Sequence, residues 1–491
     1  MSTNLSKSKY LSGMQCLKRL WLESHRRDLI PPISPAQERV FSQGHAVGRI
    51  AREHFPGGLL LDEDPMRWAS ALEATKTALA SGLPIIFEPC FLANDCLVRS
   101  DILVKRPDAS FDLIEVKSTT HTKIEHVWDL SVQTYVLEAS GLSVARALLM
   151  HLNKTCRFPN LDNLFVTDDL TYDVRSHIPE VGPNLGFMMQ KLTSTEEPSI
   201  RLGMHCFSPY ECAFFGYCSK LWSLPSPSIF DIPHLSAEKK DDIAGRGILS
   251  LDAIPDDEPL GTQGERFVRL SKSGSNEIDV HGIRTWLSAL HYPLYFLDFE
   301  TDAPAIPRFV GLGPFSSFPF QFSLHIRAAD GSLNEAPGYL HTESSDPRRA
   351  VAEALLAQIG SEGTLIAYNA SFEKGVITEL ATFFPDIAAP LLSLPPRFAD
   401  LLDIFRKFYI DPAFCGSNSI KAVLPVLCPD LSYSALEVGN GQDAQAAWAR
   451  LISTSDPAEK KKLADSLRAY CGLDTMAMVR LFQFLDERYA R

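Results

Sequence analysis

Charged side chains interrupt three of the most strand-like apolar runs in this sequence. The interrupting residues are Asp101, Glu115, Lys117, Asp298 and Glu300. A strand that buries a charge without a compensating ion or partner is strongly disfavoured. The fold must therefore place these side chains where a metal ion, a counter-charge or solvent compensates them.

The chain is too long, at 491 residues, for one ordinary hydrophobic core. Strand-like and helical patterns alternate, so we expect an α/β protein with more than one domain. The expected elements of the first half are strands at 85–92, 96–104, 111–116 and 145–152, and a helix at 124–139. Three prolines among serines at 223–234 indicate a boundary. The resulting segments are 1–225, 226–289 and 290–491.

Hydrophobic residues make up 45% of the chain and charged residues 22%, a balance typical of soluble globular enzymes. No apolar run is long enough to span a bilayer, and the first residues lack the apolar core of a secretory signal. We therefore expect a cytoplasmic protein with no membrane partner.

The net charge of −13 does not exclude a nucleic-acid partner, because it is unevenly distributed. Residues 1–225 carry 23 Lys and Arg against 25 Asp and Glu, whereas residues 226–491 carry 24 against 35. Basic residues gather near the start, where they could contact phosphates. Clustered metal-binding carboxylates would also make the total acidic.

A first candidate site lies in the strands that contain Asp101 and Glu115. Glu115 and Lys117 share one face of their strand, because side chains alternate with a period of two. Two converging carboxylates can hold a divalent ion, and Lys117 can orient or help to deprotonate the attacking water. The alternative is an exposed strand face with an ordinary ion pair.

A second candidate site is formed by cysteines. Cys206, Cys212 and Cys218 are evenly spaced within 13 residues, among aromatic residues and a proline, and Cys16 is the natural fourth ligand. Four thiolates suit either zinc or a [4Fe–4S] cluster. The other cysteines are interpreted as core residues: Cys90, Cys96, Cys156, Cys415, Cys428 and Cys471.

A third candidate site combines four acids and a tyrosine, which are Asp298, Glu300, Glu373, Asp474 and Tyr470. Asp298 and Glu300 share one strand face, and Tyr470 and Asp474 lie on adjacent turns of one helix face. Four acids around a phosphate meet the needs of two-metal phosphodiester cleavage. Tyr470 would position or deprotonate the attacking water.

The segment Leu113-Ile-Glu115-Val-Lys117-Ser118 resembles the PD-(D/E)XK nucleases of the RecB-like branch. The resemblance implies that Gln133, in the following helix, helps to shape the site, whereas Tyr135 comes too early for the family's tyrosine. The family's histidine is not expected at His45 or His54, which are interpreted as surface or packing histidines. Glu88 is a further candidate for the site, or else a solvated strand residue.

The cysteines extend this resemblance to the iron–sulphur nucleases of the AddB type and of CRISPR adaptation. In those relatives one cysteine precedes the nuclease core and three follow it, and together they bind a [4Fe–4S] cluster. The resemblance therefore implies a cluster held by Cys16, Cys206, Cys212 and Cys218. The spacing of the three later cysteines departs from the relatives, which usually have a two-residue gap first.

Residues 290–491 resemble the DnaQ-like 3′–5′ exonucleases of the DEDD class, in the subgroup that carries a tyrosine. The resemblance implies an RNase H-like fold, with Mg²⁺ or Mn²⁺ bound by Asp298, Glu300, Glu373 and Asp474. Glu373 departs from the aspartate usual in the family. Two acids between the second and third motifs, Asp400 and Asp403, are interpreted as helix-start residues. Ser419 and Lys421 are candidates for contacts with a nucleic-acid backbone.

Together the resemblances imply a metal-dependent DNA nuclease, acting on single-stranded or frayed DNA in repair or in defence against foreign DNA. Two alternatives stay open, an RNA-processing 3′–5′ exonuclease and a DNA-binding clamp with only one active nuclease site. The segment 243–255 is either a helix–glycine turn–helix unit that holds a DNA backbone or a plain linker. Protein partners are not indicated by the sequence.

Overall fold

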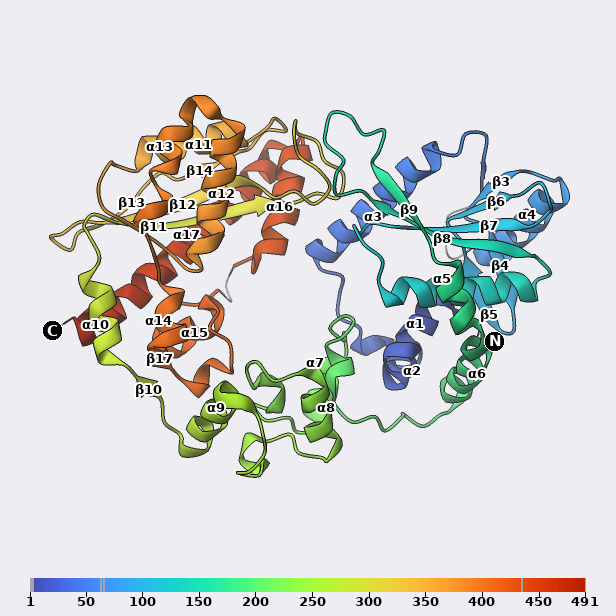
Figure 1. Cartoon of the computed structure of the whole chain (residues 1–491), viewed down its shortest axis with the longest axis horizontal. Coiled ribbons are helices and arrows are strands. Elements are labelled where there is room, and N and C mark those ends of the chain that lie inside the picture. The colour runs from blue at the N-terminus through green and yellow to red at the C-terminus, as the bar shows by residue number, and fades with distance from the viewer. Residues whose placement is uncertain (1–3, 62–63, 65–66, 434–435, 491) are drawn as a thin grey trace. The chain divides into compact units, whose positions relative to one another are not determined.

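A computed structural model describes residues 4–61, 64, 67–433 and 436–490. The chain divides into two compact units (Figure 1). Unit 1 comprises 1–33, 37–223 and 304–316, and unit 2 comprises 34–36, 224–303 and 317–491. The predicted segment 226–289 thus lies in unit 2, and residues 304–316 lie in unit 1. Each unit is described by itself.

Helices and strands alternate in unit 1. Its helical elements are α1 Lys7–Gln15, α2 Leu17–His25, η1 Arg27–Leu29, α3 Pro35–Glu53, α4 Trp68–Ala80, α5 Ile124–Ala139, α6 Thr171–Thr193, η3 Met204–Cys206 and α7 Phe215–Leu221. Its strands are β1 Leu5–Ser6, β2 Leu59–Leu60, β3 Ile85–Phe87, β4 Cys90–Ala93, β5 Cys96–Arg99, β6 Ile102–Lys105, β7 Phe111–Lys117, β8 Val144–Leu152 and β9 Phe165–Asp169.

The main sheet of unit 1 has the strand order β2-β3-β6-β7-β8-β9, with β7 and β8 parallel and β6 and β7 antiparallel. Alternate residues of β7 enter different cores. Leu113 packs in the cluster that contains residues of α1, α5 and α6, whereas Ile114 packs in the cluster that contains Ala51 of α3. Glu115 follows the register of Leu113, so the alternation of the strand directs it toward α5.

Two strands expected to be continuous are each broken in two. The run 85–92 splits into β3 and β4, and the run 96–104 splits into β5 and β6. The break lies at Glu88, whose φ of 58° is unusual for a residue with a side chain. The Glu88 N–H still donates to the Asp101 carbonyl at 3.0 Å, so the two strands bend together. One half of this hairpin joins the main sheet, and the other joins a small sheet of order β1-β5-β4.

Unit 2 begins with a helical segment and continues as a mixed α/β fold. Its helical elements are η4 Ile229–Asp231, α8 Ala237–Gly245, η5 Leu251–Ala253, α9 Gly261–Ser273, α10 Val280–Ser288, α11 Arg348–Gln358, α12 Ala370–Phe383, η6 Pro385–Ile387, α13 Ala388–Leu392, η7 Pro395–Arg397, α14 Leu402–Lys407, η8 Pro412–Phe414, α15 Ile420–Leu427, α16 Gly441–Ser453 and α17 Pro457–Tyr489. Its strands are β10 Glu277–Ile278, β11 Leu294–Asp302, β12 Phe318–Arg327, β13 Leu333–Glu335, β14 Tyr339–Leu340, β15 Thr364–Ala367, β16 Phe398–Asp400 and β17 Tyr409–Ile410.

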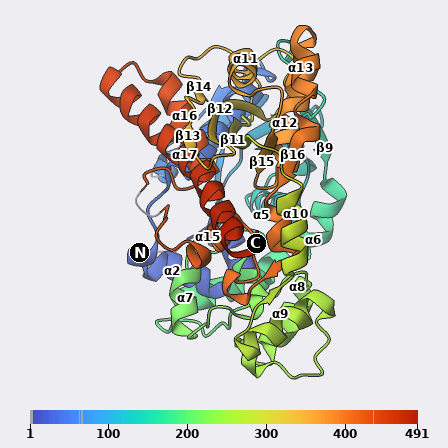
Figure 2. The ribbon, with the colours of Figure 1, turned by 90° about the vertical axis from the view of Figure 1, so that its left-hand side faces the viewer.

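The main sheet of unit 2 has the strand order β13-β12-β11-β15-β16, and β14 also pairs with β12. The strand β11 is antiparallel to β12 and parallel to β15. Phe296 packs in a cluster with residues of α17, whereas Leu297 packs in a cluster with residues of α11 and α12. Figure 2 shows α17 and α12 on opposite sides of this sheet. The even-numbered acids of β11 therefore point to the α17 side.

The segment 226–289 contains a small apolar cluster formed by residues of η4, α8, η5 and α9. Gly247 ends α8 in a left-handed conformation, with a φ of 84°, and the Ile248 N–H donates to the Ile243 carbonyl at 3.3 Å. A single 3-10 turn, η5, follows the glycines within 243–255. Among the described residues, no single helix is long and apolar enough to cross a membrane. One bent pair of helical segments, α12 and 385–397, has the length and composition of a membrane span, and these two properties are the whole of the evidence for it.

Candidate functional sites

Glu115 lies at the centre of a hydrogen-bonded group in unit 1, although it is only 2% exposed. The Lys7 ammonium nitrogen is 2.9 Å from Oε1 and 3.1 Å from Oε2 of Glu115. The Lys117 ammonium is 2.6 Å from Oε1, and Gln133 donates from Nε2 to Oε2 at 2.7 Å. The structure therefore brings the predicted residues Glu115, Lys117 and Gln133 together, and it adds Lys7.

Asp129 is a second buried acid of this site that the sequence analysis missed. Its Oδ2 lies 2.6 Å from Lys117 Nζ, and its Oδ1 accepts from Gln133 Nε2 at 2.9 Å. Lys7 Nζ lies 3.5 Å from the same Oδ1. Asp129 precedes Gln133 by four residues in α5, so the two share a helix face. That spacing was the signal available in the sequence.

Electrostatics distinguish the two acids. Burial, together with the nearby carboxylates of Asp101 and Asp129, raises the pKa of Glu115 to about 7 against the opposing effect of the two lysines. Burial also acts to raise the pKa of Asp129, but the ammonium groups of Lys117 and Lys7 outweigh it and hold that pKa below its usual range. Protons and cations therefore compete for Glu115 near neutral pH.

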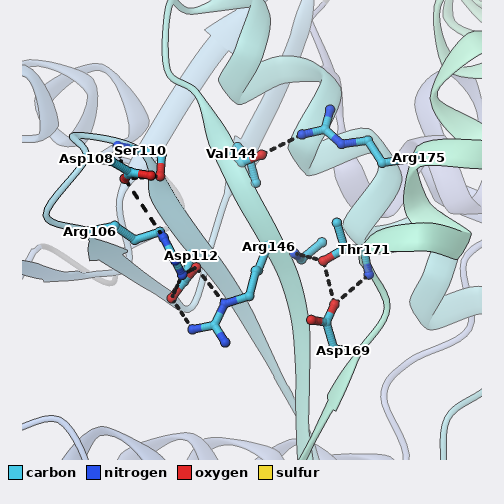
Figure 3. A network of polar contacts seen from close by, with 10 residues as sticks. Arg106, Asp108, Ser110, Asp112, Val144, Arg146, Asp169, Thr171 and Arg175 are labelled. Carbon is cyan, nitrogen blue, oxygen red and sulfur yellow. Dashed lines mark hydrogen bonds and ion pairs between the residues drawn. The ribbon is translucent and has the colours of Figure 1, made fainter.

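Asp112, three residues before Glu115 on β7, shows what a structural acid looks like in this sheet. Figure 3 shows its carboxylate between Arg106 and Arg146. Arg106 Nη1 donates to Oδ1 at 3.0 Å, and Arg146 Nη2 donates to Oδ2 at 2.5 Å. Burial is outweighed by these arginines, so the pKa of Asp112 stays below its usual value. Asp112 needs no further cation, whereas Glu115 relies on flexible lysines.

Asp101 lies at the junction of β5 and β6, and its Oδ2 accepts from the Val116 N–H at 2.6 Å. It lines a cavity of about 670 Å³ with Glu88 and His45. His45 is exposed, as expected for a surface histidine, and it also lines this cavity with Asp101. His54 instead makes an edge contact with Phe165, with ring centroids 5.3 Å apart.

The same cavity has a basic wall. Arg49 and Arg52 line it together with His45, at positions that share one face of α3. Arg52 Nη1 lies 3.5 Å from Glu88 Oε1, so part of this positive charge is already paired. Tyr135 lies elsewhere, because its hydroxyl accepts from Asn94 Nδ2 at 3.0 Å.

The four predicted cysteines line one small cavity of about 20 Å³. Cys16 joins α1 to α2, Cys206 ends η3, and Cys218 lies in α7. The Cys212 N–H donates to the Cys206 carbonyl at 2.8 Å, so the loop folds back on itself. None of these four cysteines forms a disulfide, and burial raises the pKa of Cys218 to about 11. The donor set is that of a closed thiolate site.

Polar contacts join helices α1 and α2 to residues 197–210. Gln15 donates from Nε2 to the carbonyls of His205, at 2.8 Å, and Tyr210, at 2.7 Å. The nearly buried Lys18 Nζ lies 2.6 Å from Glu197 Oε1. Elements nearly two hundred residues apart in the chain thus meet around the cysteines.

The acids predicted in unit 2 lie close to one another. Ligand atoms of Asp298, Glu300 and Cys471 all lie within 4.8 Å of each other. Glu373 comes from the first turn of α12, and Asp474 comes from α17. Asp298 is half-buried, and the other three acids are at most 8% exposed. Within the described part of the chain, none of the four acids forms a salt bridge, and one carboxylate oxygen of Glu373, Oε2, is buried without a hydrogen-bond partner.

Burial raises the pKa of each acid. Burial, followed by the carboxylates of Asp474, Glu300 and Glu373, raises the pKa of Asp298 well above its usual range. Burial raises the pKa of Glu300 and of Glu373 to about 8 in each case, and it also raises that of Asp474. A divalent cation would compensate the carboxylates that the fold leaves uncompensated.

Aromatic and basic side chains flank these acids. Lys421 Nζ donates to the Tyr470 hydroxyl at 3.3 Å and lies 5.2 Å from the ring centroids of both Tyr470 and Tyr433. The Tyr433 hydroxyl donates to Asp474 Oδ1 at 2.6 Å, a contact that the sequence analysis missed. Tyr433 lies in a polar segment without helical periodicity, which gave no signal.

Cys471 corrects the interpretation of the scattered cysteines. It is fully buried, as expected for a core residue, but its Sγ lies 3.9 Å from Asp298 Oδ2. It therefore belongs to the acidic site as well. Its position next to Tyr470 in the chain was the signal available.

Asp400 and Asp403 have structural contacts. Asp400 accepts hydrogen bonds from the N–H groups of Asn369, Ala370 and Leu402, at 2.9, 3.1 and 3.0 Å. It thereby fixes the start of α12, one turn before Glu373. Asp403 pairs with Lys407 one helical turn later.

Comparison with known families and curated proteins does not indicate a biochemical activity for this chain. Residues 295–419 match a family model described as a domain of unknown function, DUF2779. This chain is 28% identical over 223 residues to "Uncharacterized protein MG366 homolog" of Mycoplasma pneumoniae, covering 41% of this chain and 33% of that protein. It is 28% identical over 246 residues to "Uncharacterized protein UU173" of Ureaplasma parvum, covering 45% and 35%. The chain spans about a third of the length of these curated relatives.

Among solved structures, the chain is similar to the one titled "Crystal structure of SSO0001". The sequence identity is 11%, and the similarity covers 45% of this chain and 87% of that chain. The TM-score is 0.23.

The raised pKa values predict how the metal-free protein responds to pH. Glu300 and Glu373 bind protons more tightly in the folded than in the unfolded state, so the stability they contribute is complete below pH 4.5 and is lost as the pH rises through about 8. In chelator, the free energy of unfolding of unit 2 should fall over this range. Glu373→Gln should flatten the slope by up to about 1.4 kcal/mol per pH unit.

Urea unfolding followed by pulse proteolysis, with the C-terminal fragments identified by mass, measures this slope. Glu353→Gln is the matched control, because Glu353 is an exposed partner of Arg349 on α11, away from the acids. A slope that Glu373→Gln leaves unchanged would contradict the prediction.

Proposed function

We propose that the protein is a metal-dependent nuclease of the cytoplasm, with one phosphodiester-cleaving site in each unit and an iron–sulphur cluster in unit 1. The leading substrate is DNA with single-stranded or frayed ends. The observation that carries the proposal is the acidic group of unit 2, in which the carboxylates of Glu300, Glu373 and Asp474 all act on the half-buried Asp298, without a salt bridge among the described residues.

The composition of this group supports two-metal phosphodiester cleavage. Its oxygen donors suit Mg²⁺ or Mn²⁺. Ions bound there would supply Lewis-acid stabilisation and lower the pKa of a bound water. Tyr470 can hold the attacking water through its hydroxyl, and Lys421 holds that hydroxyl at 3.3 Å. The strand order, with β11 central and one antiparallel neighbour, supports the RNase H-like fold that the resemblance implies.

Unit 1 supports a second site of the PD-(D/E)XK kind. Asp101 and Glu115 approach each other across neighbouring strands, and Lys117 and Gln133 contact Glu115 directly. The cavity beside Asp101 has a basic wall that suits a phosphate backbone. In unit 2, Glu373 is near enough to raise the pKa of Asp298, which supports a role for it at that site despite its departure from the family pattern.

The donor set of the cysteine site suits either a zinc ion or a [4Fe–4S] cluster, because four thiols line one cavity. The resemblance to the iron–sulphur nucleases supports the cluster. An RNA-processing exonuclease remains the second candidate, because two-metal cleavage acts on the phosphodiester bond that DNA and RNA share.

Cys212→Ser should remove the cluster. Anaerobically purified parent protein is expected to be brown, with about four iron and four sulphide per chain. The variant should be colourless and its residues 1–225 less stable, because one of the four thiolates is lost. Cys415→Ser, at a half-buried cysteine of unit 2, should keep the colour. Stoichiometric zinc without iron, under anaerobic handling, would refute the cluster.

Lys117→Ala should abolish cleavage by unit 1 while divalent-metal binding largely survives, because the lysine is not a metal ligand. Cleavage of end-labelled single- and double-stranded DNA is measured in an Asp298→Ala background, which silences unit 2. Lys105→Ala on β6 is the control and should cleave normally. If the Asp298→Ala protein with Lys117 unchanged binds DNA but never cleaves it with Mg²⁺ or Mn²⁺, unit 1 is a clamp.

Asp298→Ala should abolish nucleotide release by unit 2, measured on 3′-labelled DNA and RNA in a Lys117→Ala background. Loss of one metal-binding carboxylate should slow release by roughly a thousandfold or more, about 4 kcal/mol of transition-state stabilisation. Tyr470→Phe should cost less, since the carboxylates remain. Comparable rates for the parent and Asp298→Ala would refute the site, and the preferred polymer separates the DNA and RNA hypotheses.

A further inference from the structure

Lys7 is anchored at a defined place next to the acids of unit 1. Leu5 and Ser6 pair with β5 as strand β1, directly before Lys7. Ser6 then caps α1 by accepting from the Lys9 N–H at 3.3 Å, and Lys7 is the first residue of that helix. The backbone of Lys7 is therefore fixed on both sides, so its contacts with the acids arise from the fold.

The ammonium group of Lys7 contacts both carboxylate oxygens of Glu115, the atoms that would bind a metal ion. It lies within 3.1 Å of both carboxylate oxygens and 3.5 Å from Asp129 Oδ1. Lys117 and Gln133 occupy the remaining directions around Glu115. The Lys7 side chain is 21% exposed, which leaves it a route toward solvent.

The formal charges of the unit 1 site indicate that Lys7 acts as a counter-ion. Asp101, Glu115 and Asp129 bring three carboxylates, which Lys7 and Lys117 nearly balance. A divalent ion added to this group would overcompensate it, whereas an ion that replaced Lys7 would leave a nearly neutral group. Asp101 remains on the cavity wall, open to an incoming cation.

We infer that Lys7 is a built-in counter-ion of the unit 1 site, which occupies the Glu115 carboxylate and is displaced when a divalent cation binds. This inference rests on the proposed nuclease function of unit 1. Lys7 would then keep the acids from repelling each other in the metal-free protein and weaken metal binding. Once displaced toward solvent, its ammonium would be free to contact a phosphate at the same site.

The test is the affinity of the full-length chain for Mn²⁺, measured by titration calorimetry and by the electron paramagnetic resonance signal of free Mn²⁺. An Asp298→Asn, Glu373→Gln background weakens the unit 2 site. Lys7→Gln should bind Mn²⁺ at least about tenfold more tightly, because a neutral, somewhat shorter side chain no longer competes as a cation. Lys7→Arg keeps the charge and should not tighten binding. Lys9→Gln, the same change two residues along α1, should match the background protein.

A merely structural role for Lys7 would give unchanged or weaker binding, and that result overturns the inference. Adding Asp101→Asn to Lys7→Gln should abolish the tight binding. If the background protein shows no Asp101-dependent Mn²⁺ binding and Lys7→Gln does not create it, both this inference and the proposed function of unit 1 fail. Binding that is present but not tightened by Lys7→Gln overturns the counter-ion role alone.

A labelling experiment on the unsubstituted protein makes the test independent of the folding of Lys7→Gln. Acetylation by an N-hydroxysuccinimide ester is followed by mass spectrometry with and without Mn²⁺. Displacement should increase the acetylation rate of Lys7 several-fold when Mn²⁺ is added, while that of Lys9 stays constant. A Lys7 rate that Mn²⁺ leaves unchanged or lowers overturns the inference.

Discussion

The burial of carboxylates is the constraint on which both candidate sites depend. A carboxylate removed from water needs a counter-charge, a proton or a metal ion. The chain meets this need in three ways. Arginines hold Asp112, lysines hold Glu115, and the acids of unit 2 have raised pKa values without a salt bridge among the described residues. The kind of compensation thus separates an acid of the scaffold from an acid available for chemistry.

The sheets set where these acids can point. Alternation along β7 places Glu115 on the side of α5, and alternation along β11 places Asp298 on the side of α17. In both units one strand and one helix therefore supply the centre of the site. The helix start that supplies Glu373 is itself fixed by Asp400, which accepts hydrogen bonds from the backbone there. Secondary structure therefore positions these acids.

Local patterns in the sequence predicted part of this arrangement. A period of two placed Glu115 beside Lys117, and helical spacing placed Tyr470 beside Asp474. Contacts between residues far apart in the chain gave little signal in the sequence. Lys7, for example, contacts Glu115 although more than a hundred residues separate them. The split of the strands at Glu88 was also missed, because an apolar run does not reveal a positive φ. Cys471 appeared to be an ordinary core residue, since only the packing of α17 brings it to Asp298.

In the metal-free protein, the two sites differ in how far their acidic charge is already compensated. In unit 1 the lysines already neutralise most of the acidic charge, so an incoming cation gains less attraction and must displace a bonded ammonium group. In unit 2 the acids repel each other and compete with protons, so a cation relieves an existing cost. Cations at limiting concentration should therefore fill unit 2 first. Under the proposed nuclease function, activity at the two sites should then separate along a metal titration, with unit 1 requiring the higher concentration.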